Sequence, residues 1–446
     1  MPPNGSWTVD ETPGSSTLVS IDGHDFVLGN FRWHEEDTST TTSFLTCCCR
    51  RCAARASACD RLDPNQTGPS PRNQPITRSY IMGEADGPLR VQAYVCNEKG
   101  GKLQLQDIEL PPLKATQVEI DMTHCGVCHT DVHMRDNDWG VSDYPLVLGH
   151  EGVGFVRRVG DSTRKFKVGE QVGVSWIRDS CSVCTSCLEG KENLCKNGFQ
   201  GTYLGKSAGG YGKDPHNEHG GCFSKVMRVE ERFVFKVPGN ITPEIMCPLL
   251  CGGSTVFEPI CDYVHPGSKV GIVSIGGLGT VAIKLAKLYG GKVTAFSSSA
   301  KKKDATLAIG AEDFVVLTDK ENMAAHANQY DLLIDTTPIN HDFAPLMDLL
   351  TFDGVYCRVG VPAANDQAFS YGWIPLVFTK KKICGSVVSG CSRITKMVDM
   401  VSSNLKYMEK DAKDWRPQIM PFSKVNEALD MLQNRSNKGY RIMLKW

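Results

Sequence analysis

Short runs in which apolar and polar residues alternate dominate the chain from about residue 85 to residue 250. Alternation with a period of two places the apolar side chains on one face of a strand. Glycines punctuate these runs, as they do between the strands of an antiparallel sheet. This region is therefore predicted to form a β-rich domain, with strands over residues 103–110, 117–122, 152–159 and 171–174.

The pattern changes after Cys251, where apolar strands alternate with helical segments. Such alternation is typical of a parallel, doubly wound α/β sheet with helices on both faces. The predicted strands cover residues 269–275, 292–297, 331–335 and 354–359, and the first helix covers 278–289. We expect this second domain to span residues 251–393.

The last fifty residues predict a helix over 393–402 and a closing strand over 441–446. We expect this segment to return to the β-rich domain. That domain would then comprise residues 85–250 together with 394–446. No internal repeat is evident.

Residues 1–84 are rich in Ser, Thr, Pro, Gly and Asn and show no sustained periodicity. Such a segment has little apolar surface from which to build a core, so we expect a largely disordered extension. Acidic residues such as Glu35, Glu36 and Asp37 argue against a transit peptide, although organelle targeting stays open. The cluster Cys47–Cys49 suggests acylation, but no amphipathic or spanning segment adjoins it.

Composition limits which binding partners and which cellular compartment are expected for the protein. The 446 residues carry 49 basic and 50 acidic side chains, so no broad basic field favours nucleic acid or an anionic membrane. No apolar run reaches 18 residues, and no secretory signal is visible at the N-terminus. The 19 cysteines are odd in number and widely spread, which favours a reducing compartment over a disulfide scaffold. We therefore expect a cytoplasmic protein.

The spacing C-x2-C-x2-C-x7-C, at Cys181, Cys184, Cys187 and Cys195, predicts a structural metal site. Four thiolates close a tetrahedral shell around Zn²⁺ and leave no position for water. The surrounding residues are polar and turn-rich, so the loop has no core of its own and the metal would stabilise it. Disulfides or four unrelated buried thiols are the alternatives.

A second constellation has mixed ligands spread through the chain. It consists of Cys128, His150, Glu151 and Cys251. Mixed nitrogen, oxygen and sulfur ligands suit a catalytic zinc, which keeps one coordination position open for water or substrate. The alternative is that His150 and Glu151 are a simple pair at a strand edge. We expect two zinc ions per chain.

The segment Ser274-Ile275-Gly276-Gly277-Leu278-Gly279 follows a predicted strand and opens a predicted helix, as a dinucleotide-binding fingerprint does. The helix N-terminus would face the pyrophosphate. Serine replaces the usual first glycine. The segment is therefore predicted to be the cofactor-binding turn of a Rossmann-type domain. The alternative is a glycine-rich turn between strand and helix that binds no cofactor.

The next predicted strand ends at Ser297, Ser298 and Ser299, with Lys302 beyond. A carboxylate at this tip would hold the ribose 2′-hydroxyl of NAD, whereas hydroxyls and a cation suit the 2′-phosphate of NADP. We therefore predict NADP(H). A solvated serine turn with surface lysines is the alternative.

Several segments resemble the zinc-dependent medium-chain alcohol dehydrogenases, and the cinnamyl alcohol dehydrogenase group in particular. They are Cys125-Gly-Val-Cys-His-Thr-Asp, Asn137-Asp-Trp-Gly, Gly149-His-Glu-Gly, Lys165-Phe-Lys-Val-Gly-Glu, Leu249-Leu-Cys-Gly-Gly and the serine-lysine tip. The resemblance covers residues 85–446. It implies a GroES-like catalytic domain, a homodimer, and NADP(H)-dependent interconversion of primary alcohols and aldehydes, with cinnamyl or other aromatic compounds as the expected substrates.

The resemblance also implies residue roles. Cys128, His150 and Cys251 would bind the catalytic zinc, with Glu151 as an exchangeable ligand. Thr130 would contact the substrate oxygen, while His133 and Asp138 would pass its proton outward; Thr130 could instead be a helix N-cap. Further cofactor contacts are expected at Thr255, Thr336 and Gly360, beside those of the fingerprint and the serine tip.

Trp139 and Trp176 are expected at the substrate pocket, and Trp176 departs from the small residue usual in the family. Both indoles could equally be core packing.

Two other functions remain open at this point. One is a non-catalytic NADPH-binding or zinc-binding protein that has kept the fold, because a fold alone does not give activity. The other is a reductase of C=C or C=N bonds. The complete ligand set, together with Thr130 and His133, disfavours both.

Overall fold

In the computed structural model, the described residues are 17–21, 24–28, 87–203, 220–409, 416–434, 436–437 and 441–446. The chain divides into two compact units, Met1–Tyr80 and Ile81–Trp446. Within the first unit, β1 (Thr17–Ile21) and β2 (His24–Leu28) pair as an antiparallel hairpin, which the sequence pattern did not predict. The rest of the expected disordered extension, including Cys47–Cys49, lies outside the described residues.

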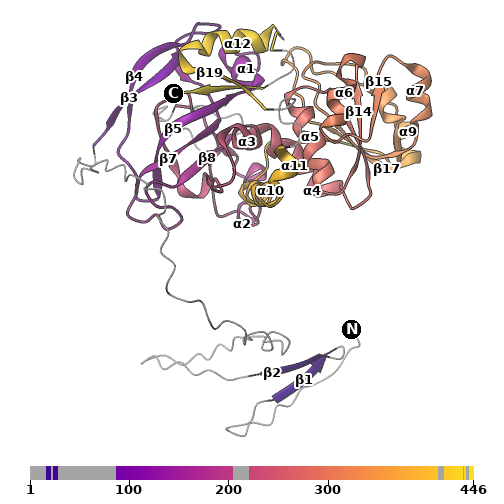
Figure 1. The fold of residues 1–446 in the computed structure, drawn as a ribbon, viewed down its shortest axis with the longest axis horizontal. Helices are drawn as coiled ribbons and strands as arrows, with labels where there is room; N and C mark the ends of the chain where they lie inside the picture. Colours follow the sequence, from indigo (N-terminus) through magenta and orange to yellow (C-terminus); the bar gives the residue numbers. More distant parts are fainter. Residues whose placement is uncertain are drawn as a thin grey trace, which may run out of the picture. The chain divides into compact units, whose positions relative to one another are not determined.

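The second unit contains a seven-stranded sheet built around β5 (Gln117–Val127) and β7 (Glu151–Val159), which pair antiparallel (Figure 1). The long strand β5 pairs with β11 along its first half and with the C-terminal strand β20 along its second half. The closing strand therefore returns to this sheet. Its other members are β8 (Gln171–Val174), β11 (Val226–Glu230), β12 (Val234–Lys236), β19 (Gln418–Pro421) and β20 (Ile442–Lys445).

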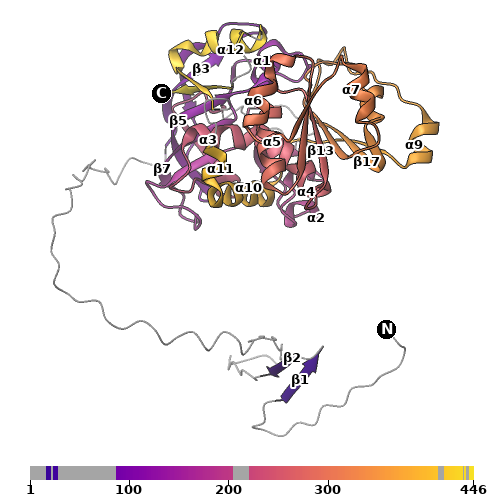
Figure 2. The same ribbon diagram turned by 45° about the vertical axis from the view of Figure 1, so that its right-hand side comes forward.

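Two smaller sheets accompany it. One has the order β4-β3-β6, from Gln104–Leu110, Leu89–Cys96 and Leu146–Val147, and the other pairs β9 (Ile177–Ser180) with β10 (Phe199–Gly201). The helix α1 (His129–Asp136) follows β5 and contacts α12 (Val425–Gln433). In Figures 1 and 2 the yellow C-terminal elements accordingly lie among the purple strands of this domain.

The six-stranded parallel sheet has the order β15-β14-β13-β16-β17-β18. Figure 2 shows β13 and β17 with the covering helices. Its strands are β13 (Lys269–Val273), β14 (Lys292–Ser297), β15 (Asp313–Val316), β16 (Tyr330–Asp335), β17 (Leu350–Arg358) and β18 (Lys382–Gly385). Its helices are α4 (Ser254–Tyr263), α5 (Gly277–Leu288), α6 (Lys303–Ala308), α7 (Lys320–Ala325), α8 (Ala344–Met347) and α9 (Trp373–Thr379).

From β13, the strands β14 and β15 are added on one side of the sheet, and β16, β17 and β18 are added on the other. The strand order therefore reverses between β13 and β16. In open α/β sheets ligands bind outside the carboxyl ends of the strands at such a point. The fold is thus the predicted α/β class, with a doubly wound domain joined to a β-rich one.

Helix α10 (Cys391–Ser403) follows β18 and is itself followed by α11 (Leu405–Glu409). The domain boundary expected at residue 394 falls within α10, which packs against α4 through Ile394, Met397 and Val401. None of the described helices is long and apolar enough to cross a membrane.

Candidate active site

The four mixed metal-binding side chains come together in the described structure. The candidate ligand atoms of Cys128, His150, Glu151 and Cys251 lie within 4.8 Å of one another, and all four residues are buried. Cys128 lies between β5 and α1, and Glu151 is the first residue of β7. Cys251 lies in a π-helical turn, η4 (Leu249–Gly253), between α3 (Pro243–Pro248) and α4. Such π-turns occur frequently at functional sites.

His150 is oriented for metal binding by hydrogen bonds on its far side. Its Nδ1 lies 2.9 Å from the hydroxyl of Tyr203, which donates a 2.9 Å bond to Asp131. Because the tyrosine oxygen accepts from Nδ1, the lone pair is on Nε2. The buried Nε2 has no hydrogen-bond partner among the described residues, so this nitrogen fits a metal ion.

The two thiols also fit zinc. The sulfurs of Cys128 and Cys251 are 3.9 Å apart. Two sulfurs bound tetrahedrally at about 2.3 Å would lie about 3.8 Å apart, far beyond a disulfide bond. The hydrogen-bonding contact with Cys251 lowers the pKa of Cys128 well below its ordinary value, and His150 and Arg441 favour the thiolate further.

Glu151 is held by an arginine from the other end of the chain. Nη1 of Arg441 lies 2.9 and 3.0 Å from its two carboxylate oxygens, and both side chains are buried. Strand β5 passes so closely that a Cβ on Gly126 would lie 2.0 Å from Oε2 of Glu151. Nε of Arg441 also lies 3.4 Å from the carbonyl of Gly277, so one side chain spans the metal ligands and the fingerprint turn.

The sequence did not single out Asp131, Tyr203 or Arg441. Asp131 caps α1 by accepting the Cys128 N–H at 2.8 Å, and it also accepts the Gly149 N–H at 3.0 Å. One carboxylate therefore fixes the backbone at the candidate ligand Cys128 and at the residue that precedes the candidate ligand His150. The local signal was a carboxylate three residues after Cys128, at the capping-box spacing.

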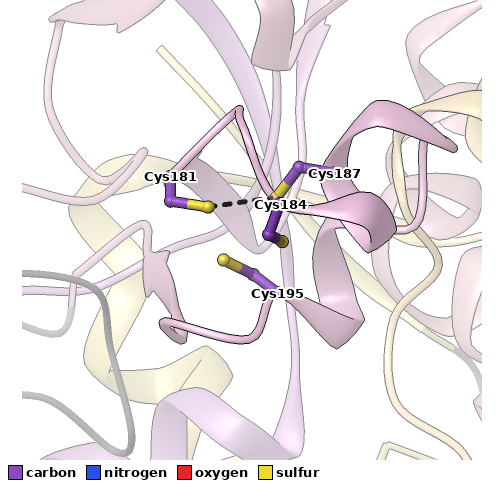
Figure 3. Close-up of side chains that lie close together, drawn as sticks. All are labelled: Cys181, Cys184, Cys187 and Cys195. Atoms are coloured by element: carbon purple, nitrogen blue, oxygen red, sulfur yellow. Dashed lines mark hydrogen bonds between the residues drawn. The ribbon is translucent and has the colours of Figure 1, made fainter.

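The cysteine lobe brings its four predicted residues together (Figure 3). The sulfurs of Cys181, Cys184, Cys187 and Cys195 also form a group within 4.8 Å, and those of Cys181 and Cys187 are 3.9 Å apart. Backbone N–H groups of Val183 and Cys184 lower the pKa of Cys181 to about 6. The lobe is formed by α2 (Thr185–Leu188) and a 3₁₀ turn, η2 (Glu192–Leu194).

Each of the described cysteines is a free thiol. The disulfide alternative for the lobe is therefore not what the structure contains.

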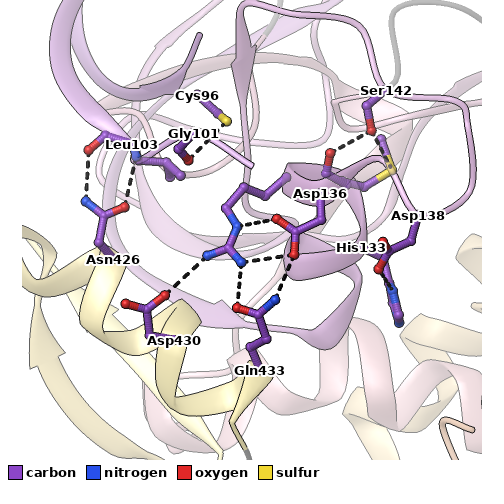
Figure 4. Close-up of polar contacts among 12 residues, drawn as sticks. Cys96, Gly101, Leu103, His133, Asp136, Asp138, Ser142, Asn426, Asp430 and Gln433 are labelled. Atoms are coloured by element: carbon purple, nitrogen blue, oxygen red, sulfur yellow. Dashed lines mark hydrogen bonds and ion pairs between the residues drawn. The ribbon is translucent and has the colours of Figure 1, made fainter. Parts of the chain in front are cut away.

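The proposed proton path lies on and beside α1. Oγ1 of Thr130 is 3.5 Å from the sulfur of Cys128. Figure 4 shows His133 beside Asp138, and Nδ1 of His133 is 2.7 Å from the carboxylate. The N-cap of α1 is Cys128, so the alternative that Thr130 caps the helix is wrong; Thr130 is its second residue. Trp139 stacks on His133, with ring centroids 4.8 Å apart.

Helix α12 is hydrogen-bonded to α1 through a network of polar side chains (Figure 4). Arg135 donates to Asp136 at 2.7 Å and to Gln433 at 2.9 Å, and Gln433 donates back to Asp136 at 3.0 Å. Residues near the C-terminus therefore stabilise the helix that carries Thr130 and His133.

Trp176 lies directly against a candidate metal ligand. Its ring packs edge-on against His150 and Tyr203, with centroids 5.1 Å away in both cases. Trp139 donates from Nε1 to the carbonyl of Pro362 at 3.3 Å. Both indoles are partly buried against the core of the β-rich domain, so their packing role and their expected pocket role are compatible.

The fingerprint turn joins β13 to α5, as predicted. Ser274, at the place of the usual first glycine, has φ of 70°. This left-handed conformation is one that glycine adopts without strain and serine does not. Thr336 stabilises the turn, since its hydroxyl donates to the Ser274 carbonyl at 2.7 Å. A Cβ on Gly279 would lie 2.2 Å from the same oxygen, so the helix packs closely here.

The serine tip lies at the carboxyl end of β14. Ser297 is buried and accepts the Ser299 N–H at 3.2 Å, whereas Ser298 is exposed. Nζ of Lys302 reaches back to the carbonyl of Ile275 at 2.7 Å. Hydroxyls and an ammonium group thus stand beside the fingerprint turn, and the segment has no acidic side chain.

The two remaining residues expected to contact the cofactor are Thr255 and Gly360. The first lies beside Cys251, and the second lies against the loop after β16. Thr255, in α4, donates to the carbonyl of Cys251 at 2.9 Å. Gly360 follows β17, and a Cβ there would lie 2.0 Å from the carbonyl oxygen of Thr337. The loops after β16 and β17 therefore touch.

Family models match most of the second unit. The alcohol dehydrogenase GroES-like domain matches residues 114–239, and the zinc-binding dehydrogenase domain matches residues 277–403. A mannitol dehydrogenase of Apium graveolens is 34% identical over 364 residues, which are 81% of this chain and 95% of that protein.

Solved structures agree with these matches. A cinnamyl alcohol dehydrogenase from Sorghum bicolor superposes with a TM-score of 0.72 and 32% identity, covering 80% of this chain and 98% of that one. A CAD from Helicobacter pylori complexed with NADP(H) has a TM-score of 0.69 and 26% identity, covering 80% and 98%. The chain belongs to the zinc-dependent medium-chain alcohol dehydrogenases, in the group of the cinnamyl alcohol dehydrogenases.

Proposed function

We propose that this protein is an NADP(H)-dependent zinc alcohol dehydrogenase that interconverts primary alcohols and aldehydes. The buried cluster of Cys128, His150, Glu151 and Cys251 carries the proposal, because its free Nε2 and its two sulfurs have the arrangement that a zinc ion requires. A zinc ion there supplies Lewis-acid polarisation of the substrate oxygen. Hydride transfer is the chemistry of the nicotinamide.

The chain's own side chains would then handle the hydroxyl proton. Thr130 stands beside Cys128 and would hydrogen-bond the substrate oxygen. His133 and Asp138 form a pair with side-chain exposures of 13% and 36%, so exposure rises along the path. This order supports transfer of the proton from a buried pocket towards solvent, with His133 passing it on to Asp138.

The choice of NADP(H) rests on the tip of β14. Ser298 and Ser299 offer hydroxyls, Lys302 offers an ammonium group, and no carboxylate competes for a ribose hydroxyl. The similar CAD from Helicobacter pylori is complexed with NADP(H), which is consistent with this choice.

For substrates, we propose aromatic or cinnamyl-type alcohols and aldehydes. Trp176 packs on the candidate ligand His150, and Trp139 packs on His133. Two indoles beside the reacting groups favour a planar, apolar substrate. The relative from Sorghum bicolor is a cinnamyl alcohol dehydrogenase, whereas the relative from Apium graveolens is a mannitol dehydrogenase. Relatives of this chain therefore differ in substrate.

We further propose two zinc ions per chain, one at each cluster. The expected domain limits, 85–250 with 394–446 and 251–393, are retained as a proposal. The free thiols of the described residues support a reducing compartment, and we propose the cytoplasm.

Purified protein should be assayed with cinnamaldehyde, benzaldehyde and hexanal, each with NADPH and with NADH, and the products identified. We expect cinnamyl alcohol from cinnamaldehyde, turnover mainly with NADPH, and loss of activity after removal of zinc. Hydrocinnamaldehyde as the product would instead identify a C=C reductase. Tight NADPH binding without turnover of any aldehyde or alcohol would favour the non-catalytic alternative.

A further inference from the structure

A partly buried ion pair joins the carboxyl ends of β16 and β17. Asp335 and Arg358 are the last residues of these strands and are register partners in the parallel ladder. Nη1 of Arg358 lies 2.7 Å from Oδ2 of Asp335, whose side chain is fully buried. Oδ2 also accepts a 2.5 Å hydrogen bond from the hydroxyl of Tyr356.

The other donors of Arg358 reach the loops that follow the two strands. Nε donates to the carbonyl of Gly360 at 2.8 Å, and Nη2 donates to the carbonyl of Ile339 at 2.6 Å. Asp335 also holds the loop after β16, since its Oδ1 accepts the Thr337 N–H at 2.9 Å. One guanidinium therefore ties the loop after β17 to the loop after β16.

These loops border the cofactor crevice. β16 adjoins β13 at the point where strand order reverses, and Thr336 contacts the fingerprint turn at Ser274. The tip of β14, on the other side of β13, carries the groups proposed for the adenosine ribose. A dinucleotide lies across such a crevice with one half on each side, so the loops after β16 and β17 face the nicotinamide half.

The charge of this pair is maintained inside the protein. Burial opposes ionisation, but contacts from His341, Arg358 and Thr337 outweigh it and lower the pKa of Asp335 to about 2. A buried ion pair is a weak source of stability, because desolvation offsets most of the attraction. What this pair supplies beyond stability is the defined position of the two loop carbonyls.

We propose that Arg358 is a positioning residue for the cofactor, fixing the backbone at Gly360 and Ile339 so that both loops are held against the nicotinamide half. This rests on the proposed use of a nicotinamide cofactor, but not on the preference for its phosphorylated form. The groups near the 2′-phosphate lie at β14, so Arg358 should affect NADPH and NADH alike.

The test is Arg358→Lys, which keeps a positive charge beside Asp335, but its single compact ammonium group cannot span the carboxylate and both loop carbonyls as the planar guanidinium does. Equilibrium dissociation constants for NADPH and NADH should both rise by about tenfold, the scale of one or two lost hydrogen bonds. The KM for the cofactor should rise more than kcat falls, and zinc content should not change. Tyr356→Phe is the control, because it removes a donor to Asp335 without touching either loop. It should lower Tm and leave both dissociation constants near those of the wild type.

Asp335→Asn/Arg358→Met provides a second route if the lysine variant does not fold. It removes both charges and keeps the acceptor for Thr337, so the protein should fold yet bind both cofactors weakly. Wild-type affinity in a folded Arg358 variant, or equal weakening by Tyr356→Phe, would overturn the inference while leaving the proposed function intact. Failure of the wild-type protein to bind either cofactor would overturn both.

Discussion

Lys302 is the residue on which the cofactor preference depends most directly. Lys302→Ala should weaken NADPH binding by about 1–3 kcal/mol, the usual value of a hydrogen bond to a charged group, and scarcely change NADH binding. Ser297→Asp should move the preference towards NAD, since a carboxylate repels the phosphate and accepts from the ribose. Titrating each variant with both cofactors checks this. Equal weakening of both by Lys302→Ala would contradict the assignment, because Lys302 would then act through its bond to Ile275.

Trp176 should limit the size of the substrate. Trp176→Leu removes an indole that packs on His150 and Tyr203, which opens space beside the metal ligands. We expect the ratio of kcat/KM for the bulkier, non-planar diphenylacetaldehyde to that for cinnamaldehyde to rise by about tenfold or more, because a change of even one methylene in an apolar pocket carries about 1–3 kcal/mol. Zinc content of the variant is the control. An unchanged ratio with intact zinc would place Trp176 in the core alone.

Single residues also show where the sequence was informative. Cys128, His150, Glu151 and Cys251 could be selected because their types and flanking motifs are specific, and they do come together. Arg441 could not be found in this way. It meets Glu151 across 290 positions, and only the return of β20 to β5 brings them into contact.

Among the elements, the parallel strands were predicted best. β14 has its predicted limits of 292 and 297, because a continuous apolar run ends there in polar residues. β17 begins at Leu350, four residues before its prediction, because Leu350 also pairs with Tyr330 of β16. The exposed Phe352 and Asp353 lie in the irregularity between this pair and the next, at Val355. The two edge strands of this sheet, β15 and β18, and the short strands β9 and β10 carry no clear alternation and were missed. Tertiary pairing rather than local pattern forms them.

The cysteine lobe, formed by α2 and η2, and the turn η4, which carries Cys251, should respond differently to loss of a metal ligand. Metal analysis should find two zinc ions in the wild type and one in either variant. Cys184→Ser should lower Tm and solubility, because the lobe of α2 and η2 has little core besides the thiols. Cys251→Ser should abolish turnover while leaving Tm nearly unchanged, since η4 is surrounded by buried apolar residues. Equal loss of folding in both variants would show that the sites are misassigned.

For the whole molecule, residues 1–84 should be dispensable for chemistry, because every residue assigned above to metal, cofactor or substrate lies beyond them. A chain beginning at Glu84 should keep kcat/KM and zinc content, as measured beside the full-length protein. A truncated protein that folds and binds zinc but has lost activity would show that the extension contributes to the active site.

The six-stranded sheet should also be the site of self-association, as expected for this family. Among the described strands β18 pairs only with β17, which leaves one edge open. The adjoining α9 exposes 79% of Trp373 and 81% of Phe378, and Ile374 and Val377 are exposed beside them. An open edge with large exposed apolar side chains is typical of a protein–protein interface. In a dimer with two-fold symmetry, the same surface of each chain would bury that of the other.

Light scattering after size exclusion should therefore give about twice the chain mass of 48.9 kDa. Trp373→Asp/Phe378→Asp should give the monomer mass, because two carboxylates cannot be buried unpaired at an interface. Leu105→Asp is the matched control, since Leu105 is an exposed apolar residue in β4, away from this sheet, and its variant should remain dimeric. Each variant should still bind NADPH, since neither change touches the fingerprint turn. A wild-type protein that is monomeric at micromolar concentration would remove the basis for this interface.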